Sequence, residues 1–262
     1  MKCPFRMMSA VRAAGIICFL TLDAGKADCR DATMKIVEEM RRIEFTRIDY
    51  DEEVHPYYGY IKGSIPVLIS APHGAKHYRK AEGVWKGADA YTSSLAIVLG
   101  RLTGAHVLFV KNKTEEDPNN DAGTEYKEAL EKTVEENRIK FVLDLHGSDG
   151  RRPYKADVGT MHATRALCSC PSYRDIMERV FAGFEPRVFN QRFSACGEGT
   201  ITRFARNSLR IEAAQIEINA NYRIVESKST GFRADPRNVL DLVERLRAVI
   251  LAVNEKIAES AS

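Results

Sequence analysis

The chain has 262 residues, of which 44% are hydrophobic and 29% are charged, and its formal net charge is +3. This length suits a single α/β domain, and the composition is that of a globular protein rather than a disordered one. Residues 1–30 account for the whole excess of positive charge. The remainder therefore lacks the basic stripe that is typical of nucleic-acid binding, and we expect no nucleic-acid partner.

Residues 1–33 are predicted to form a lead that precedes the folded domain. Basic residues are followed by an apolar run from Ala13 to Leu22, which resembles an export signal but is too short to span a membrane. No clean cleavage site follows the run, and Met34 offers a second start. We expect a single α/β domain over residues 34–262 and a cytoplasmic protein, with export as the alternative if residues 1–30 are a true signal.

Strand and helix patterns alternate along this domain. Phe45–Tyr50 alternates apolar and polar residues as a half-buried strand does, and Tyr57–Ile61 is predicted to pair with it in a hairpin. The next predicted elements are a strand at Val67–Ser70, a helix from Ala90 to Arg101, a strand at His106–Val110, a helix over Tyr126–Val134 and a strand at Phe141–Leu145.

The second half continues the alternation. Its predicted elements are strands at Asp157–Ala163 and Arg187–Phe189, a helix at Tyr173–Phe181 between them, a short helix at Thr200–Arg206 and a long strand at Ile211–Asn219. Asp235-Pro236 is typical of a helix start, and an apolar stripe from Val239 to Ile257 follows it. This order predicts a three-layer α/β/α domain around a central mixed, mostly parallel sheet.

Three apolar runs end in residues that can bind a metal or move a proton. His73 and His146 each follow such a run and precede a glycine, and Glu217 lies within a third. In α/β folds functional groups lie beyond the carboxyl ends of strands, and a catalytic zinc takes three protein ligands and leaves one position open. We predict both histidines as ligands, and we expect the glycines to permit a sharp turn and to leave space for substrate.

The third ligand is expected to be a carboxylate. We favour Asp89 at the start of a predicted helix, where its alternative role is a helix cap, over Glu82 in the loop after His73. Asp144 lies two residues before His146 and therefore on the same strand face. It can orient a histidine or bond backbone amides. The other histidines are expected to be structural: His55, His77, His106 and His162.

Glu217 is predicted to be the general base. A carboxylate among apolar neighbours is costly unless it is paired or functional. Beside a metal site it can take a proton from water and pass it to a leaving nitrogen. The alternative is a structural ion pair with an arginine such as Arg223. Serine-hydrolase, nucleotide-binding and dehydrogenase motifs are absent from the sequence.

From Pro66 to Arg223 the sequence resembles the N-formylglutamate amidohydrolase family, which is related to the zinc carboxypeptidases and aspartoacylases. The resemblance lies in Ala71-Pro-His73-Gly, Asp89-x-x-Thr92, Asp117-Pro-Asn119, Asp144-Leu-His146-Gly, Gly199-Thr-Ile-Thr202 and Gln215-Ile-Glu217-Ile-Asn219. It implies a phosphorylase/hydrolase-like fold, one Zn2+ at His73, Asp89 and His146, and catalysis by Glu217. Family members often carry arginine after Asp-Pro-Asn, whereas this chain has Asn120, which disfavours formylglutamate itself as the substrate.

These observations predict a zinc-dependent amidohydrolase that cleaves a C–N amide bond in an N-acyl amino acid or a short peptide. Asn119 and Arg223 are the candidates for substrate binding. One alternative is a zinc carboxypeptidase-type or γ-glutamyl peptidase, which needs the same metal site and a longer cleft. A second alternative is a non-catalytic metal-binding or sensor protein, and the presence of both histidines with Glu217 argues against it.

Overall fold

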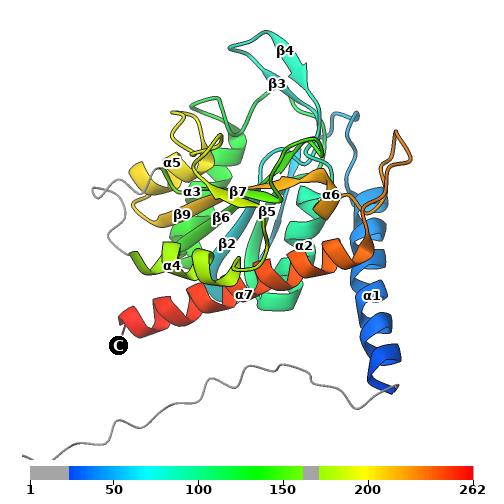
Figure 1. Ribbon diagram of the computed structural model, residues 1–262. Coiled ribbons are helices and arrows are strands. Elements are labelled where there is room, and N and C mark those ends of the chain that lie inside the picture. Colours follow the sequence, from blue (N-terminus) through cyan, green and yellow to red (C-terminus); the bar gives the residue numbers. More distant parts are fainter. Residues whose placement is uncertain (1–23, 162–170, 262) are drawn as a thin grey trace, which may run out of the picture.

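The computed structural model describes residues 24–161 and 171–261, and these form a central sheet with helices on both faces (Figure 1). The sheet has seven strands in the order β1-β5-β2-β6-β9-β7-β8. Neighbours among β5, β2, β6 and β9 are parallel, whereas β1 and β7 run antiparallel to β5 and β9. The predicted three-layer α/β/α fold with a mixed, mostly parallel sheet is confirmed.

The central strands of the sheet are buried on both faces, as parallel sheets covered by helices require. Its strands are β1 (Tyr58–Ile61), β2 (Ile65–Ala71), β5 (Ala105–Val110), β6 (Phe141–Ser148), β7 (Ala156–Gly159), β8 (Arg187–Phe189) and β9 (Glu212–Asn219). A separate hairpin, β3 (His77–Arg79) with β4 (Val84–Lys86), projects from the top of the molecule in Figure 1.

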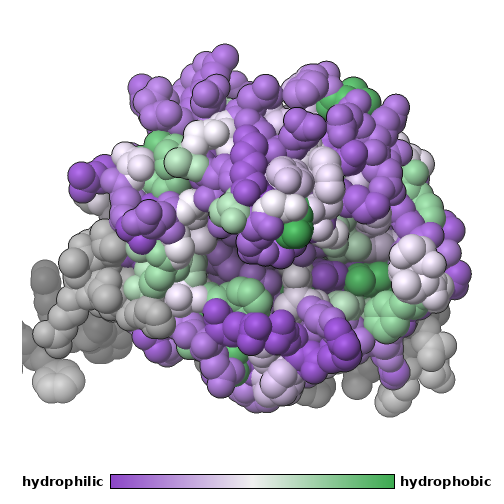
Figure 2. Space-filling view, turned by 90° about the horizontal axis from the view of Figure 1, so that it is seen from above, coloured by the Kyte–Doolittle hydropathy of each residue, from purple (hydrophilic) through white to green (hydrophobic). Residues whose placement is uncertain are grey.

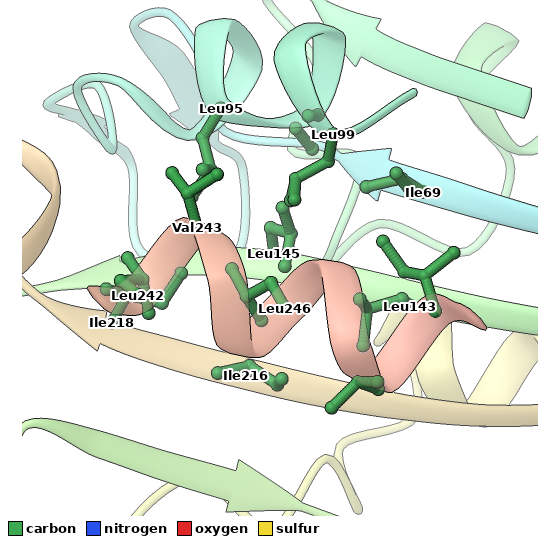
Figure 3. Close-up of a cluster of buried hydrophobic side chains, with 14 of the residues drawn as sticks. Ile69, Leu95, Leu99, Leu143, Leu145, Ile216, Ile218, Leu242, Val243 and Leu246 are labelled. Carbon is green, nitrogen blue, oxygen red and sulfur yellow. The ribbon is translucent and has the colours of Figure 1, made fainter. Parts of the chain in front are cut away.

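Two groups of helices cover the two faces. The helices are α1 (Ala24–Arg47), α2 (Thr92–Thr103), α3 (Glu125–Asn137), α4 (Pro171–Val180), α5 (Ile201–Asn207), α6 (Ala220–Arg223) and α7 (Pro236–Ala261). One core joins α1, α2, α4 and α7 to the sheet, and a smaller one joins α3 and α5 to the other face. Figure 3 shows Leu242, Val243 and Leu246 of α7 packed between α2 and the strands, as the apolar stripe predicts.

The strand predicted at Phe45–Tyr50 is wrong, because residues 45–47 belong to the end of α1. The buried apolar residues of this segment recur at helical spacing: Val37, Met40 and Ile43 are buried, whereas Phe45 is 42% exposed. The strand β1 pairs with β5 instead, so the predicted hairpin does not form. Alternation over a few residues cannot separate a strand from the last turn of an amphipathic helix.

Other boundaries differ by a few residues. The strand β7 ends at Gly159, and Ala163 lies outside the described residues, as does His162. The lead also lies largely outside them, but α1 begins at Ala24, ten residues before the predicted domain start at Met34. Among the helices of the described chain, none carries a stretch long and apolar enough to cross a membrane.

Candidate metal centre

Two buried histidines from neighbouring strands face one carboxylate. His73 lies two residues beyond β2, and His146 lies near the end of β6. Their Nδ1 atoms lie 3.5 Å and 3.4 Å from the same oxygen, Oδ2 of Asp89. The two rings are 4.9 Å apart and nearly perpendicular, at 76°. The two histidine Nδ1 atoms and Oδ2 of Asp89 therefore face a common point.

The far side of each histidine is held by a second carboxylate. Nε2 of His73 lies 2.8 Å from Oδ1 of Asp117, and Nε2 of His146 lies 3.0 Å from Oδ2 of Asp144. Both carboxylates are fully buried. A histidine that donates one ring N–H to a carboxylate presents the other nitrogen as a free lone pair, which is the usual arrangement of metal-ligating histidines. Here both histidines would bind a metal through Nδ1.

The donor set fits zinc. The three ligand atoms of His73, Asp89 and His146 lie within 4.8 Å of one another, and two imidazoles with one carboxylate leave the open fourth position of a catalytic zinc site. A second group, His73 with His77 and Asp117, meets the same distance criterion. In that group the two ring planes are stacked at 3.9 Å and 4°, so their nitrogen lone pairs lie in separate parallel planes. In addition, Arg79 already binds Asp117 with Nε 2.6 Å from Oδ2.

A backbone hydrogen bond holds Asp89 beside His73. Its N–H donates to the carbonyl of His73 at 2.7 Å, which ties it to the segment that follows β2. It is not the side-chain cap of α2, whose first residue is Thr92 and whose cap position is Tyr91 with no side-chain cap bond. Glu82 lies elsewhere, on the β3–β4 hairpin, where it pairs with Arg79 and Lys86.

Charges within the cluster control its protonation. Burial alone raises the pKa of Asp89, but hydrogen bonds to His146 and His73 outweigh it and hold that pKa far below the ordinary value. Burial lowers the pKa of His146, but the charge and hydrogen bond of Asp144 reverse this and raise the pKa well above its usual range. Without a metal, His146 therefore tends to carry a proton that a metal ion must displace.

Glu217 lies directly beside the centre. In the parallel pairing of β6 with β9 it is the register partner of His146. It is 6% exposed, and burial raises its pKa to about 7, with His146 opposing the rise and Asp89 adding to it. Gln215 donates from Nε2 to Oε1 of Glu217 at 3.0 Å, which orients the carboxylate. Within the described residues, Arg223 and Glu217 do not lie within ion-pair distance of each other.

The two glycines expected to leave room for substrate also allow other side chains to approach the backbone closely. A Cβ on Gly147 would lie 2.3 Å from Nη2 of Arg223, and a Cβ on Gly74 would lie 1.9 Å from Oγ of Ser93. The space above Gly147 is thus filled by the guanidinium of Arg223, and Gly74 lets the chain pack against α2. Both glycines are needed for close packing, and Gly147 also lines the cavity over the histidines.

A cavity of about 440 Å³ opens over the cluster and is lined by His73, Asp89, His146 and Glu217, and also by Asn119. Figure 2 looks down on this end of the molecule and shows a hollow bordered largely by hydrophilic residues. Oδ1 of Asn119 accepts the backbone N–H of Ile201 at 2.7 Å, so this side chain caps α5 and its amide nitrogen remains for a ligand. Arg223 does not line this cavity but borders a neighbouring one.

Sequence reasoning missed two residues that shape the site. It named Asp117 only as part of the Asp117-Pro-Asn119 motif, whereas the structure pairs it with His73. It placed Asp157 only within a strand, yet this buried carboxylate accepts the backbone N–H groups of Arg192 and Phe193 at 2.9 and 3.1 Å and holds the loop that walls the cavity. An aspartate between the apolar residues Ala156 and Val158 is the signal that marks it.

Comparison with solved structures shows the fold. N-formylglutamate amidohydrolase from Ralstonia eutropha JMP134 is similar, with a TM-score of 0.56 and 16% identity over 78% of this chain and 98% of that one. Gene product Atu2144 from Agrobacterium tumefaciens has a TM-score of 0.53 and 12% identity over 80% and 100% of the two chains. No protein-family model and no curated protein matches the sequence. The family resemblance inferred from motifs is thus shown at the level of the fold.

Proposed function

We propose that this protein is a zinc-dependent amidohydrolase that cleaves a C–N amide bond in an N-acyl amino acid or a related small amide. The observation that carries the proposal is the matched pair of histidines, each with Nε2 on a buried carboxylate and Nδ1 aimed at Asp89. His73, Asp89 and His146 would hold the metal. The amidohydrolase with a similar fold agrees with this chemistry.

Zinc, when bound, supplies a Lewis acid that polarises the amide carbonyl and eases the deprotonation of water. The chain itself supplies the proton carrier. Glu217 lies beside His146 in register, and its pKa, raised by burial to about 7, allows it to accept a proton from the attacking water and donate it to the leaving nitrogen. A cation bound beside Glu217 would lower this raised pKa, which would keep Glu217 ionised at neutral pH.

The proposed substrate is a small molecule, because the cavity over the cluster is about 440 Å³, within the range of small-ligand sites. Asn119 lines this cavity, and its amide nitrogen is the proposed donor to the substrate there. Arg223 is the proposed partner for a charged group that extends beyond the cavity. Both residues are the substrate-binding candidates that the sequence predicts.

Metal analysis with a substrate screen tests the proposal. Purified protein should carry about one zinc per chain, since one three-ligand cluster forms a single catalytic site, and should hydrolyse at least one member of an N-acyl amino-acid panel. His146→Ala should lose both zinc and turnover, whereas His55→Ala, at an exposed loop histidine, should keep both. Zinc binding without turnover on any amide would favour the non-catalytic alternative, and absence of zinc would refute the metal site.

A further inference from the structure

One of the two candidate histidine ligands carries a second histidine stacked on its ring. The ring centroid of His77 lies 3.9 Å from that of His73, and the two planes differ by only 4°. His77 is 2% exposed, and it is neither one of the proposed zinc ligands nor a residue that lines the cavity over them. Its ring therefore covers one face of the ligand without reaching the space where a substrate would bind.

Hydrogen bonding does not account for the position of the His77 ring. Its Nε2 is buried and has no hydrogen-bond partner within the described chain, and it lies 3.8 Å from Oδ2 of Asp117, beyond hydrogen-bond distance. That oxygen accepts instead from Nε of Arg79 at 2.6 Å. The other ring nitrogen, Nδ1, is 3.3 Å from the carbonyl of Ala75, which is long for a hydrogen bond. What His77 offers to the site is thus the flat face of its ring.

The backbone that carries this ring is held on both sides. In the β3–β4 hairpin His77 is the register partner of Lys86, and on its other side it forms a bridge with Thr114. The N–H of Thr114 donates to the carbonyl of Lys76 at 3.0 Å, and the N–H of Tyr78 donates to the carbonyl of Thr114 at 3.1 Å. The base of the hairpin is therefore a firm support for the stacked ring.

The other contacts of His73 leave the tilt of its ring undetermined. Its Nε2 lies 2.8 Å from Oδ1 of Asp117, which fixes one ring atom, and the ring of His146 lies nearly perpendicular to it. The outer side-chain torsion of histidine has only a broad intrinsic preference. A ring held at one atom can therefore turn, and turning moves Nδ1 away from Oδ2 of Asp89. A flat neighbour pressed against one face prevents this rotation.

We propose that His77 is a positioning residue, which fixes the ring plane of His73 by stacking so that Nδ1 stays directed at the metal position. Ligand geometry of this kind depends on neighbours whose own conformations are locked, and the support of His77 by the hairpin backbone meets that need. The role requires a flat ring and no ring nitrogen. The inference rests on the metal centre of the proposed function, but it does not require that the protein hydrolyse an amide.

Three substitutions separate the shape of His77 from its chemistry. His77→Phe keeps a flat ring without nitrogen, His77→Leu fills the space without a flat face, and His77→Ala removes the ring altogether. The zinc Kd of each variant is measured by competition with a chromophoric chelator. We expect His77→Leu and His77→Ala to bind zinc about tenfold more weakly, at the lower end of the effect of groups that support metal ligands. His77→Phe should stay within about threefold of the wild type, because it retains a stacked ring.

Cobalt in place of zinc gives a second readout, because the visible spectrum of the ion reports the geometry of its ligands. The spectrum should be retained in His77→Phe and altered in His77→Leu, in which the ring of His73 is free to tilt. Melting temperatures of the metal-free variants are measured alongside. Equal zinc Kd values for His77→Phe and His77→Leu would overturn the proposal. So would a zinc Kd that merely follows the melting temperature across the three variants, because that result indicates a general structural role.

A matched control and the zinc content complete the test. His106 is also a buried histidine, 3% exposed and stacked on the ring of Tyr60, but it belongs to neither group of possible metal ligands, so His106→Ala should leave the zinc Kd unchanged. The competing explanation is that His77 binds a second metal ion together with His73 and Asp117. In that case the wild type would carry about two zinc ions per chain and His77→Phe about one, and the proposal would be wrong.

Turnover separates this inference from the proposed function. A zinc Kd that responds to the His77 variants as expected, in a protein that hydrolyses no amide, would refute the proposed function and leave the stacking role standing. Zinc binding and amidase activity in the wild type, with an unchanged zinc Kd in His77→Leu, would refute the stacking role alone. A wild-type protein that binds no zinc would refute both.

Discussion

Replacing Asp117 by asparagine tests whether the carboxylates behind the histidines create the metal site. Oδ1 of Asp117 accepts from Nε2 of His73 at 2.8 Å and from the backbone of Asn119 at 3.1 Å, while Oδ2 accepts from Nε of Arg79 at 2.6 Å. Asparagine has the same shape but one oxygen instead of two. If that oxygen stays on His73, the NH2 group faces the N–H of Arg79, and two donors oppose each other.

The expected loss follows from this geometry. His73 keeps a partner, so the site survives, but the partner is neutral and no longer raises the basicity of the ring. Loss of such a supporting carboxylate typically weakens metal binding by about 10- to 100-fold, which corresponds to roughly 1.4–2.8 kcal/mol. Competition with a chromophoric chelator measures the zinc Kd. Asp149→Asn is the control, because Asp149 lines the same cavity but contacts neither histidine. An unchanged zinc Kd in Asp117→Asn would refute the reasoning.

Three further predictions follow from the site. Asp89→Ala should abolish tight zinc binding while Glu82→Ala leaves the zinc Kd unchanged, and the reverse result in a chelator titration would move the ligand to the hairpin. Glu217→Gln should keep zinc and its melting temperature but lose about 10²–10⁴-fold in kcat, and near-normal turnover in this variant would remove Glu217 from the mechanism. In the wild type, kcat/KM should fall as the pH drops below a pKa at or under about 7, because a general base must be ionised to act. A chain that begins at Met34 should melt as the full chain does, because the described buried side chains of α1 start at Val37, and aggregation of that chain would show that the lead stabilises the fold.

The sequence was sufficient for the centre of the sheet because those strands are buried on both faces. Val67–Ser70, His106–Val110 and Phe141–Leu145 are apolar runs of strand length, and each lies inside an observed strand. Parallel strands place their carboxyl ends at one edge, so His73, His146 and Glu217 meet there. Residues at the ends of such strands are therefore predictable from local pattern alone.

The supporting residues were not predictable in the same way. Asp117 is 44 positions from His73, and nothing in its local sequence identifies a partner at that distance. The guanidinium over Gly147 comes from Arg223, which is the last residue of α6. The β3–β4 hairpin has only three residues in each strand, too few for a periodic signal. These features depend on contacts that form only when distant segments pack.

The position of Asp89 also depends on contacts between segments that are distant in the sequence. Two residues later, Tyr91 has a φ of 69°, a left-handed conformation that costs of the order of 1 kcal/mol or more in a non-glycine residue. Its N–H donates at 2.9 Å to the buried carboxylate of Glu44, which comes from α1. On the other side, Arg223 binds the carbonyl of Ala90. Asp89, the proposed ligand, is therefore positioned by α1 and α6 together, so the first helix supports the candidate metal centre although it carries none of its proposed ligands.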